Sequence, residues 1–129
     1  MSVLYAQTSG NQSTNANNFT PMPGLTLSLP GGVDVMAIVT LNVPMPYATG
    51  TNTPGGTFGV AVNNVVTPVV ASFTYNEPAP TSTGRIPTTL VVGVPLTEQP
   101  QTIQAMWYGV RGSTVHLDSP ATLSAIIDD

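Results

Sequence analysis

The chain carries only two basic side chains, Arg85 and Arg111, and it has no lysine. Most soluble proteins spread lysine and arginine over their whole surface, so the position of any one of them says little. Here each arginine stands in a short, hydroxyl-rich segment, Thr81–Arg85 or Val110–Ser113. A guanidinium offers five donors in a rigid fork and stays charged at any working pH. Two such groups among hydroxyls indicate a site for a neutral polyhydroxylated ligand or for an anion.

The arginines also have a purely structural interpretation. Each one can pair with a nearby acid, such as Glu77 or Asp118, and so hold a loop in place. The sequence alone leaves both interpretations open.

Catalysis is not indicated by the remaining chemistry-bearing residues. His116, Asp118 and Ser119 are the residue types of a hydrolase triad, but side chains two apart on a strand diverge too little for one. The G-x-S-x-G motif of a nucleophile elbow is missing as well. A glycosidase needs two carboxylates about 5–9.5 Å apart, and a pair such as Glu77 with Asp118 lies in no recognisable motif. We therefore expect no enzyme.

Composition excludes several classes of partner and cofactor. Charged residues make up 6% of the chain and the net charge is −4, so the basic stripe of a nucleic-acid-binding protein cannot form. Anionic lipid is disfavoured for the same reason. With no cysteine and one histidine, the sequence predicts no metal site and no cofactor. A surface so poor in charge favours association, so we expect an oligomer.

The N-terminal segment has neither the basic region nor the apolar region of a secretory signal. No apolar run is long enough for a transmembrane helix. We therefore expect synthesis in the cytoplasm, no membrane insertion, and any export or surface association by a route that needs no signal peptide.

Apolar residues recur with period two from Leu25 onward, and turns rich in proline and glycine separate the runs. The pattern predicts about eight short strands in one all-β domain over residues 1–129, a β-sandwich of the jelly-roll kind. Residues 7–20 are polar and predict an irregular arm. The run 33–43 is apolar on both faces in its middle, which predicts a strand between layers or at a subunit contact. The predicted inward-facing sets are Leu25, Leu27, Leu29; Val33, Val35, Ala37, Val39, Leu41, Val43; Phe58, Val60, Val62; Val69, Ala71, Phe73, Tyr75; Leu90, Val92, Val94, Leu96; Ile103, Ala105, Trp107; Val115, Leu117; and Leu123, Ala125, Ile127.

Two tyrosines are candidates for ligand contact. Tyr47 lies in a segment, Pro46–Gly50, that reads as a loop between strands, where an aromatic ring is a better binding candidate than within a strand. Tyr75 ends a predicted strand beside Thr74, where a ring and a hydroxyl can reach a ligand together. Packing at an edge of the sandwich remains the alternative for both rings.

Five segments, in this order and spacing, resemble the fucose-binding, TNF-like N-terminal domain of Burkholderia two-domain lectins. The resemblance runs from Ile38 to Ile126. The segments are NVPMPYATG at 42–50, FTY at 73–75, STGR at 82–85, VRGS at 110–113 and HLDS at 116–119.

This resemblance implies a TNF-like jelly roll that assembles as a homotrimer, a multivalent bacterial lectin for L-fucose and fucosylated glycans on cell surfaces. It implies that fucose binds without metal in clefts between protomers. One protomer would supply Thr74, Tyr75 and Arg111, and the next would supply Tyr47, Ser82, Thr83 and Arg85.

The chain departs from the family at the edge of the implied site. Thr57 stands where the relative has a tyrosine near the sugar, and Thr81 stands where it has a glutamate at the rim. With Asp118 these residues are the rim candidates. The alternative function is a structural trimeric jelly-roll module of a phage or bacterial appendage, without glycan binding.

Overall fold

The computed structural model describes residues 1–128, and within them every regular element is a β-strand. The strands are β1 Ser2–Gln7, β2 Gln12–Thr14, β3 Thr20–Leu29, β4 Met36–Val43, β5 Pro46–Thr49, β6 Gly55–Val62, β7 Val65–Thr74, β8 Thr88–Pro95, β9 Gln101–Val110, β10 Thr114–Leu117 and β11 Thr122–Ile127. None of the elements in this range is a helix that would traverse a bilayer.

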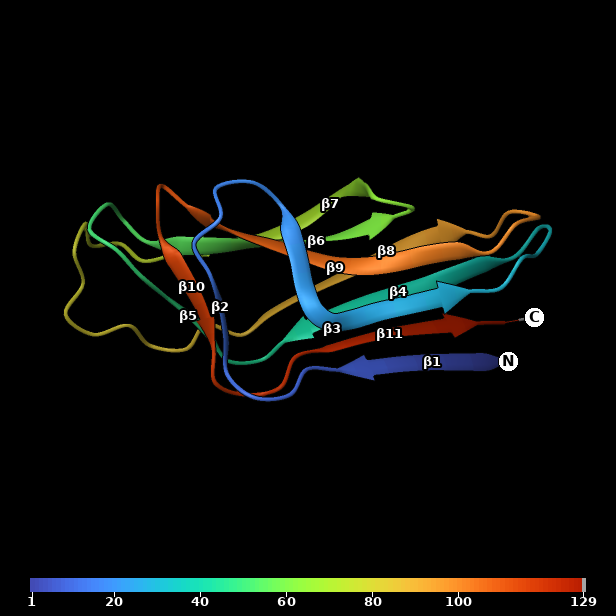
Figure 1. Cartoon of the computed structure of the whole chain (residues 1–129), viewed down its shortest axis with the longest axis horizontal. Helices are drawn as coiled ribbons and strands as arrows, with labels where there is room; N and C mark the ends of the chain where they lie inside the picture. Colours follow the sequence, from blue (N-terminus) through green and yellow to red (C-terminus); the bar gives the residue numbers. More distant parts are fainter. Residues whose placement is uncertain (129) are drawn as a thin grey trace.

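Two four-stranded antiparallel sheets form the body of the molecule, in the orders β1-β11-β4-β8 and β3-β9-β6-β7 (Figure 1). The chain passes from one sheet to the other between β3 and β4, between β7 and β8, and between β8 and β9. This interleaved order is typical of jelly rolls, and it confirms the predicted all-β sandwich. A third sheet, β2-β10-β5, lies at the end opposite the two termini (Figure 1).

The core lies between the two large sheets and is built by the period-two alternation that the sequence displays. Along β8 and β9, every second side chain is buried. Trp107 and Phe58 occupy the centre, with ring centroids 6.4 Å apart. Most of the predicted inward-facing residues are buried, which confirms the predicted faces of β3, β4, β8, β9 and β11.

Some local predictions were wrong. Val33 is 67% exposed, because β4 begins only at Met36 after a turn in which Asp34 has a φ of 57°. Val69 is 41% exposed and lies within the register shift between β6 and β7, where the pairing changes from Gly59–Val70 to Ala61–Val66. The polar segment 7–20 is irregular except for the end of β1, β2 and the start of β3, and β2 pairs with β10.

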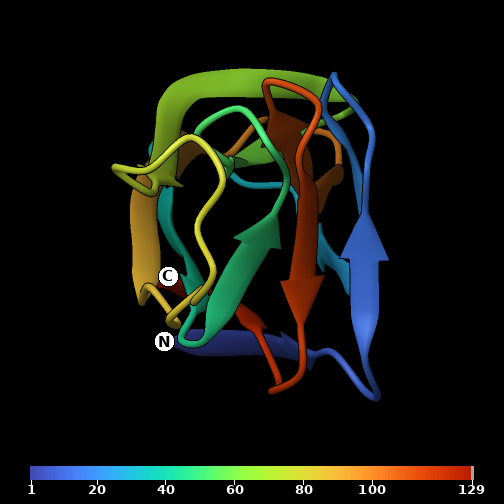
Figure 2. The ribbon, with the colours of Figure 1, turned by 90° about the vertical axis from the view of Figure 1, so that its left-hand side faces the viewer.

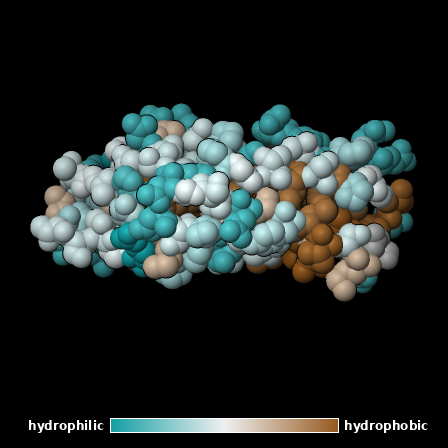
Figure 3. Space-filling model, turned by 60° about the horizontal axis from the view of Figure 1, so that its bottom comes forward, coloured by the Kyte–Doolittle hydropathy of each residue, from teal (hydrophilic) through white to brown (hydrophobic). Residues whose placement is uncertain are grey.

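The outer side of the β1-β11-β4-β8 sheet carries exposed aliphatic side chains where a monomer would place polar ones. Val3, Ile126 and Ile38 are directly opposite one another in the register and are 64%, 47% and 43% exposed. Met36 and Val91 extend this surface, which we call the apolar face. Figure 3 shows apolar residues gathered at one end of the molecule. The run 33–43 contains β4, whose outer side is exposed rather than placed between layers, and its predicted role at a subunit contact stays a prediction.

Candidate functional site

The segments that carry the predicted site residues meet at the end of the sandwich that bears the small sheet. Figure 2 looks onto this end, where the loop of residues 76–87 lies near β5 and the segment of residues 50–54 lies between this loop and the turn that joins β9 to β10. The N–H of Ile86 donates to Pro46 O at 3.0 Å, which ties the end of the loop to β5. Ser82 and Thr81 are exposed in this loop and Thr83 is half-buried.

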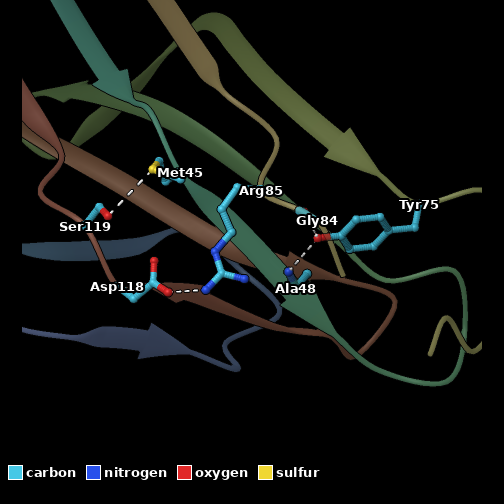
Figure 4. Close-up of polar contacts among 7 residues, drawn as sticks. All are labelled: Met45, Ala48, Tyr75, Gly84, Arg85, Asp118 and Ser119. Atoms are coloured by element: carbon cyan, nitrogen blue, oxygen red, sulfur yellow. Dashed lines mark hydrogen bonds and ion pairs between the residues drawn. The ribbon is translucent and has the colours of Figure 1, made fainter. Parts of the chain in front are cut away.

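Arg85 extends from this loop to Asp118, just after β10, and the two side chains form an ion pair (Figure 4). Each side chain is 34% exposed. The pairing with Asp118 is the one that the structural interpretation of the sequence anticipated. The pair therefore leaves part of the guanidinium open to solvent while fixing its direction.

The Arg85 guanidinium also lies over the Tyr47 ring, with Cζ 3.9 Å from the ring centroid. The His116 ring stacks on Tyr47 at 4.7 Å, with an interplanar angle of 12°. His116 Nε2 is 3.0 Å from the Thr49 hydroxyl. Contrary to the prediction of a loop, Tyr47 belongs to strand β5, which pairs with β10 and so brings Tyr47 opposite His116.

Tyr75 fixes the loop of residues 76–87, which carries Arg85 and which we call the arginine loop. Its hydroxyl donates to Gly84 O at 2.7 Å and accepts from the N–H of Ala48 at 3.4 Å (Figure 4). The phenol thus links the residue before Arg85 to the residue after Tyr47. Because its hydroxyl already has two partners, Tyr75 positions the arginine and offers a ligand mainly its ring.

Arg111 lies in the two-residue turn between β9 and β10. Arg111 and Gly112 are the central residues of a β-turn, which the Ser113 N–H closes by donating to Val110 O at 3.0 Å; their φ angles of 50° and 75° are those of a type I′ turn. The Arg111 Nε donates to Asn52 O at 3.0 Å and to Thr53 O at 3.1 Å, and Nη2 also reaches Thr53 O. A non-glycine residue rarely adopts a left-handed φ, and such positions cluster at functional sites.

Thr53 connects the surroundings of the two arginines. Its carbonyl accepts from Arg111, and its N–H donates to Pro78 O in the arginine loop at 2.9 Å. In the register Gly55 lies between Val110 on β9 and Thr74 on β7, so Thr74 and the Arg111 turn flank the start of β6. Thr74 is exposed there. The predicted residues therefore form two adjoining groups at one end of the molecule.

Electrostatics favour a cationic Arg85 beside a neutral imidazole. The hydrogen bond that Arg85 donates to the Asp118 carboxylate raises the pKa of Arg85 above its already high usual value. Burial lowers the pKa of His116 below 6.5, and the Arg85 charge lowers it further, while Asp118 acts in the opposite direction. Burial raises the pKa of Tyr75, so its phenol stays protonated at neutral pH and continues to donate to Gly84 O.

The structure places Thr57 away from the surface. It is 3% exposed, and its hydroxyl is 2.8 Å from that of Ser72. A side chain buried to this extent is not accessible to a ligand, so in this structure Thr57 does not lie at the rim of the candidate site. Thr81 and Asp118, by contrast, are exposed.

The triad residues make separate contacts. The Ser119 hydroxyl donates to Met45 Sδ at 3.8 Å, and Asp118 pairs with Arg85 (Figure 4). His116 contacts Thr49 instead. Within residues 1–128 these contacts form no Ser–His–Asp relay.

Sequence reasoning missed the backbone carbonyls of Asn52 and Thr53 as arginine partners, because carbonyls are present at every position and carry no sequence signal. It also missed the contribution of β2, whose residues line a cleft beside Tyr47 and His116.

Comparison with known proteins identifies the family. The model of the Bc2l-C N-terminal domain matches residues 4–126, nearly the whole chain. No curated protein matches the chain. The family match confirms the resemblance that the five segments carry. The chain therefore belongs to the Bc2l-C N-terminal domain family.

Proposed function

We propose that this protein is a metal-independent lectin that binds L-fucose and fucosylated glycans in clefts between the protomers of a homotrimer. Membership of the Bc2l-C N-terminal domain family suggests a lectin-type, non-enzymatic module. The observation that carries the proposal is the location of Arg85 and Arg111, the only cations among the side chains, in adjoining groups at one end of the sandwich.

The chemistry of that end suits a sugar. Two guanidinium groups can donate charge-assisted hydrogen bonds to hydroxyls, and the exposed hydroxyls of Thr74 and Ser82 can donate or accept. The ring of Tyr75, together with the edge of the Tyr47 ring that Arg85 and His116 leave uncovered, offers an apolar surface for the methyl group of fucose. One group of these residues lies in and beside the arginine loop and consists of Ser82, Thr83, Arg85 and Tyr47. The other group, Thr74 and Arg111, flanks the start of β6.

The apolar face supports the homotrimer. Exposed contiguous apolar surface is uncommon on monomers and marks an interaction site. Besides the apolar face, the chain has an apolar cleft of about 560 Å³ at the neighbouring edge of the sandwich, between β7 and β8. The residues that line this cleft include Val69, Val92 and Pro95. Two different apolar surfaces on one chain suit a head-to-tail contact, and such contacts close into rings. The family resemblance implies that such a ring of three protomers brings Arg111 of one chain toward Arg85 of the next.

The alternative is a structural trimeric module without glycan binding. It is favoured by the intrachain partners of both arginines, namely Asp118 for Arg85 and the carbonyls of Asn52 and Thr53 for Arg111. In that case the arginines brace loops and their loss affects only stability.

Titration calorimetry with L-fucose in the presence of EDTA, with D-mannose as the control sugar, tests the proposal. We expect about one fucose site per chain. Arg85→Met and Arg111→Met, which keep the aliphatic part of each side chain, should each weaken fucose binding by at least about tenfold. The trimer should persist in both variants. Absence of fucose binding to the wild type, or unchanged affinity in either variant, would overturn the assignment.

A further inference from the structure

The cleft lined by residues of β2 lies on the small sheet, beside the candidate site. It has a volume of about 180 Å³ and we call it the β2 cleft. In the register Ser13 on β2 is opposite His116 on β10, and His116 is opposite Tyr47 on β5. Side chains of directly opposed residues lie on the same face of a sheet, so these three form one row. Figure 2 shows the three strands side by side. The lining residues are Asn11, Gln12, Ser13, Tyr47, His116, Leu117 and Asp118.

Two polar side chains at the β2 cleft are open to a ligand. Asn11 and Ser13 are exposed, and neither side chain hydrogen-bonds to another residue within 1–128. The Gln12 side chain donates to Pro23 O, but its Oε1 is buried without a partner in the same part of the chain. An amide, a hydroxyl and the Asp118 carboxylate thus supply both donors and acceptors.

The cleft also has an aromatic wall, the stacked rings of Tyr47 and His116. Polar groups next to an aromatic wall match a sugar ring, which carries hydroxyls around its edge and an apolar patch of C–H groups. The Asp118 carboxylate disfavours an anion. The volume of about 180 Å³ is below the roughly 300–1,000 Å³ of most small-molecule pockets, which suits a single sugar ring.

The position of the cleft relates it to the candidate fucose site. Tyr47 contacts Arg85 and also lines the cleft, and Asp118 pairs with Arg85 and also lines the cleft. A ligand at Arg85 and a ligand in the cleft would therefore share these two side chains as a common boundary.

We propose that the β2 cleft is a second saccharide subsite, which holds the sugar residue attached to fucose through Asn11, Ser13 and the Tyr47–His116 wall. The inference rests on the proposed function. It assigns preference for fucosylated oligosaccharides to β2 rather than to Thr57, which is buried.

The test compares the affinities of methyl α-L-fucoside and of fucosyl disaccharides with α1,2, α1,3, α1,4 and α1,6 linkages, measured by titration calorimetry. For the wild type, at least one disaccharide should bind about five- to tenfold more tightly than the monosaccharide, as one or two added neutral hydrogen bonds would give. In the Asn11→Ala/Ser13→Ala variant this ratio should fall to near one while affinity for the monosaccharide stays unchanged.

Ser28→Ala combined with Asn17→Ala, two exposed positions outside the cleft, is the matched control and should keep the wild-type ratio. A ratio near one for all four linkages in the wild type, or an unchanged ratio in the cleft variant, overturns the subsite but leaves fucose binding intact. No binding of methyl α-L-fucoside to the wild type overturns the proposed function and the subsite together.

Discussion

Two glycine-to-alanine substitutions test how closely the strands beneath the candidate site are packed. Gly55 begins β6 between Val110 and Thr74, and its N–H donates to the Ser113 hydroxyl at 3.1 Å. A Cβ at Gly55 would lie 2.1 Å from Phe73 O and 2.8 Å from Thr74 Cα, whereas ordinary contacts begin at 3.4 Å. Gly84, next to Arg85, would have no atom within 4 Å of its Cβ.

The two substitutions should therefore have opposite effects. With Gly55→Ala, β6 and β7 have to separate, and overpacking of this kind typically costs about 1–3 kcal/mol. A domain of this size loses about 4 °C of unfolding midpoint per kcal/mol, so we expect a fall of about 4–12 °C. With Gly84→Ala, the unfolded chain loses freedom and the native state gains no clash, so stability should rise by up to about 1 kcal/mol.

Thermal unfolding followed by circular dichroism measures both effects, at one protein concentration because an oligomer's midpoint depends on it. Since the added methyl group displaces Thr74 relative to the Arg111 turn, fucose affinity should also fall in Gly55→Ala. Equal midpoints for Gly55→Ala and the wild type, or a comparable loss in Gly84→Ala, would refute the reasoning from close packing.

Three further perturbations address the site and the assembly. Tyr75→Phe leaves Gly84 O and the Ala48 N–H without their partner, so urea denaturation should show a loss of about 1–3 kcal/mol; undiminished stability would contradict the bracing role. Because the pKa of His116 is lowered from 6.5, the native state binds fewer protons than the unfolded state just below that pH. The contribution of His116 to the free energy of unfolding is therefore complete above about pH 6.5 and is lost as the pH falls. Urea denaturation at several pH values should show that the wild type loses more stability than His116→Gln as the pH falls below this value. Parallel plots of unfolding free energy against pH for the two proteins would contradict the prediction. Ile126→Asp places a charge in the apolar face and should give monomers in analytical ultracentrifugation, whereas Val33→Asp, at an exposed position outside that face, should not; a trimer in both would exclude the apolar face as the interface.

Much of the fold follows from the alternation of apolar and polar residues along the strands. The runs that became β4, β8, β9 and β11 could be predicted because their buried and exposed sides differ at every second residue. The short strands β2 and β5 have too few residues to show a period, and β5 is a strand only because β10 pairs with it. Tyr47 was therefore assigned to a loop although it lies in a sheet.

The sequence by itself determined the kind of chemistry available. The sequence shows two cations in hydroxyl-rich turns, few other charges, and apolar residues at every second position of the predicted strands. These are properties of single residues and their neighbours, and they suffice to predict a β-sandwich with an arginine-based site. The five ordered segments were enough to identify the family.

Only the tertiary structure decided which groups meet. The pairing of Arg85 with Asp118, the stack of Tyr47 on His116 and the burial of Thr57 depend on contacts between segments far apart along the chain. Such contacts follow from strand register and from the packing of one sheet on another, and local sequence patterns determine neither. For the same reason, the cleft beside β2 became visible only when β2 was placed against β10.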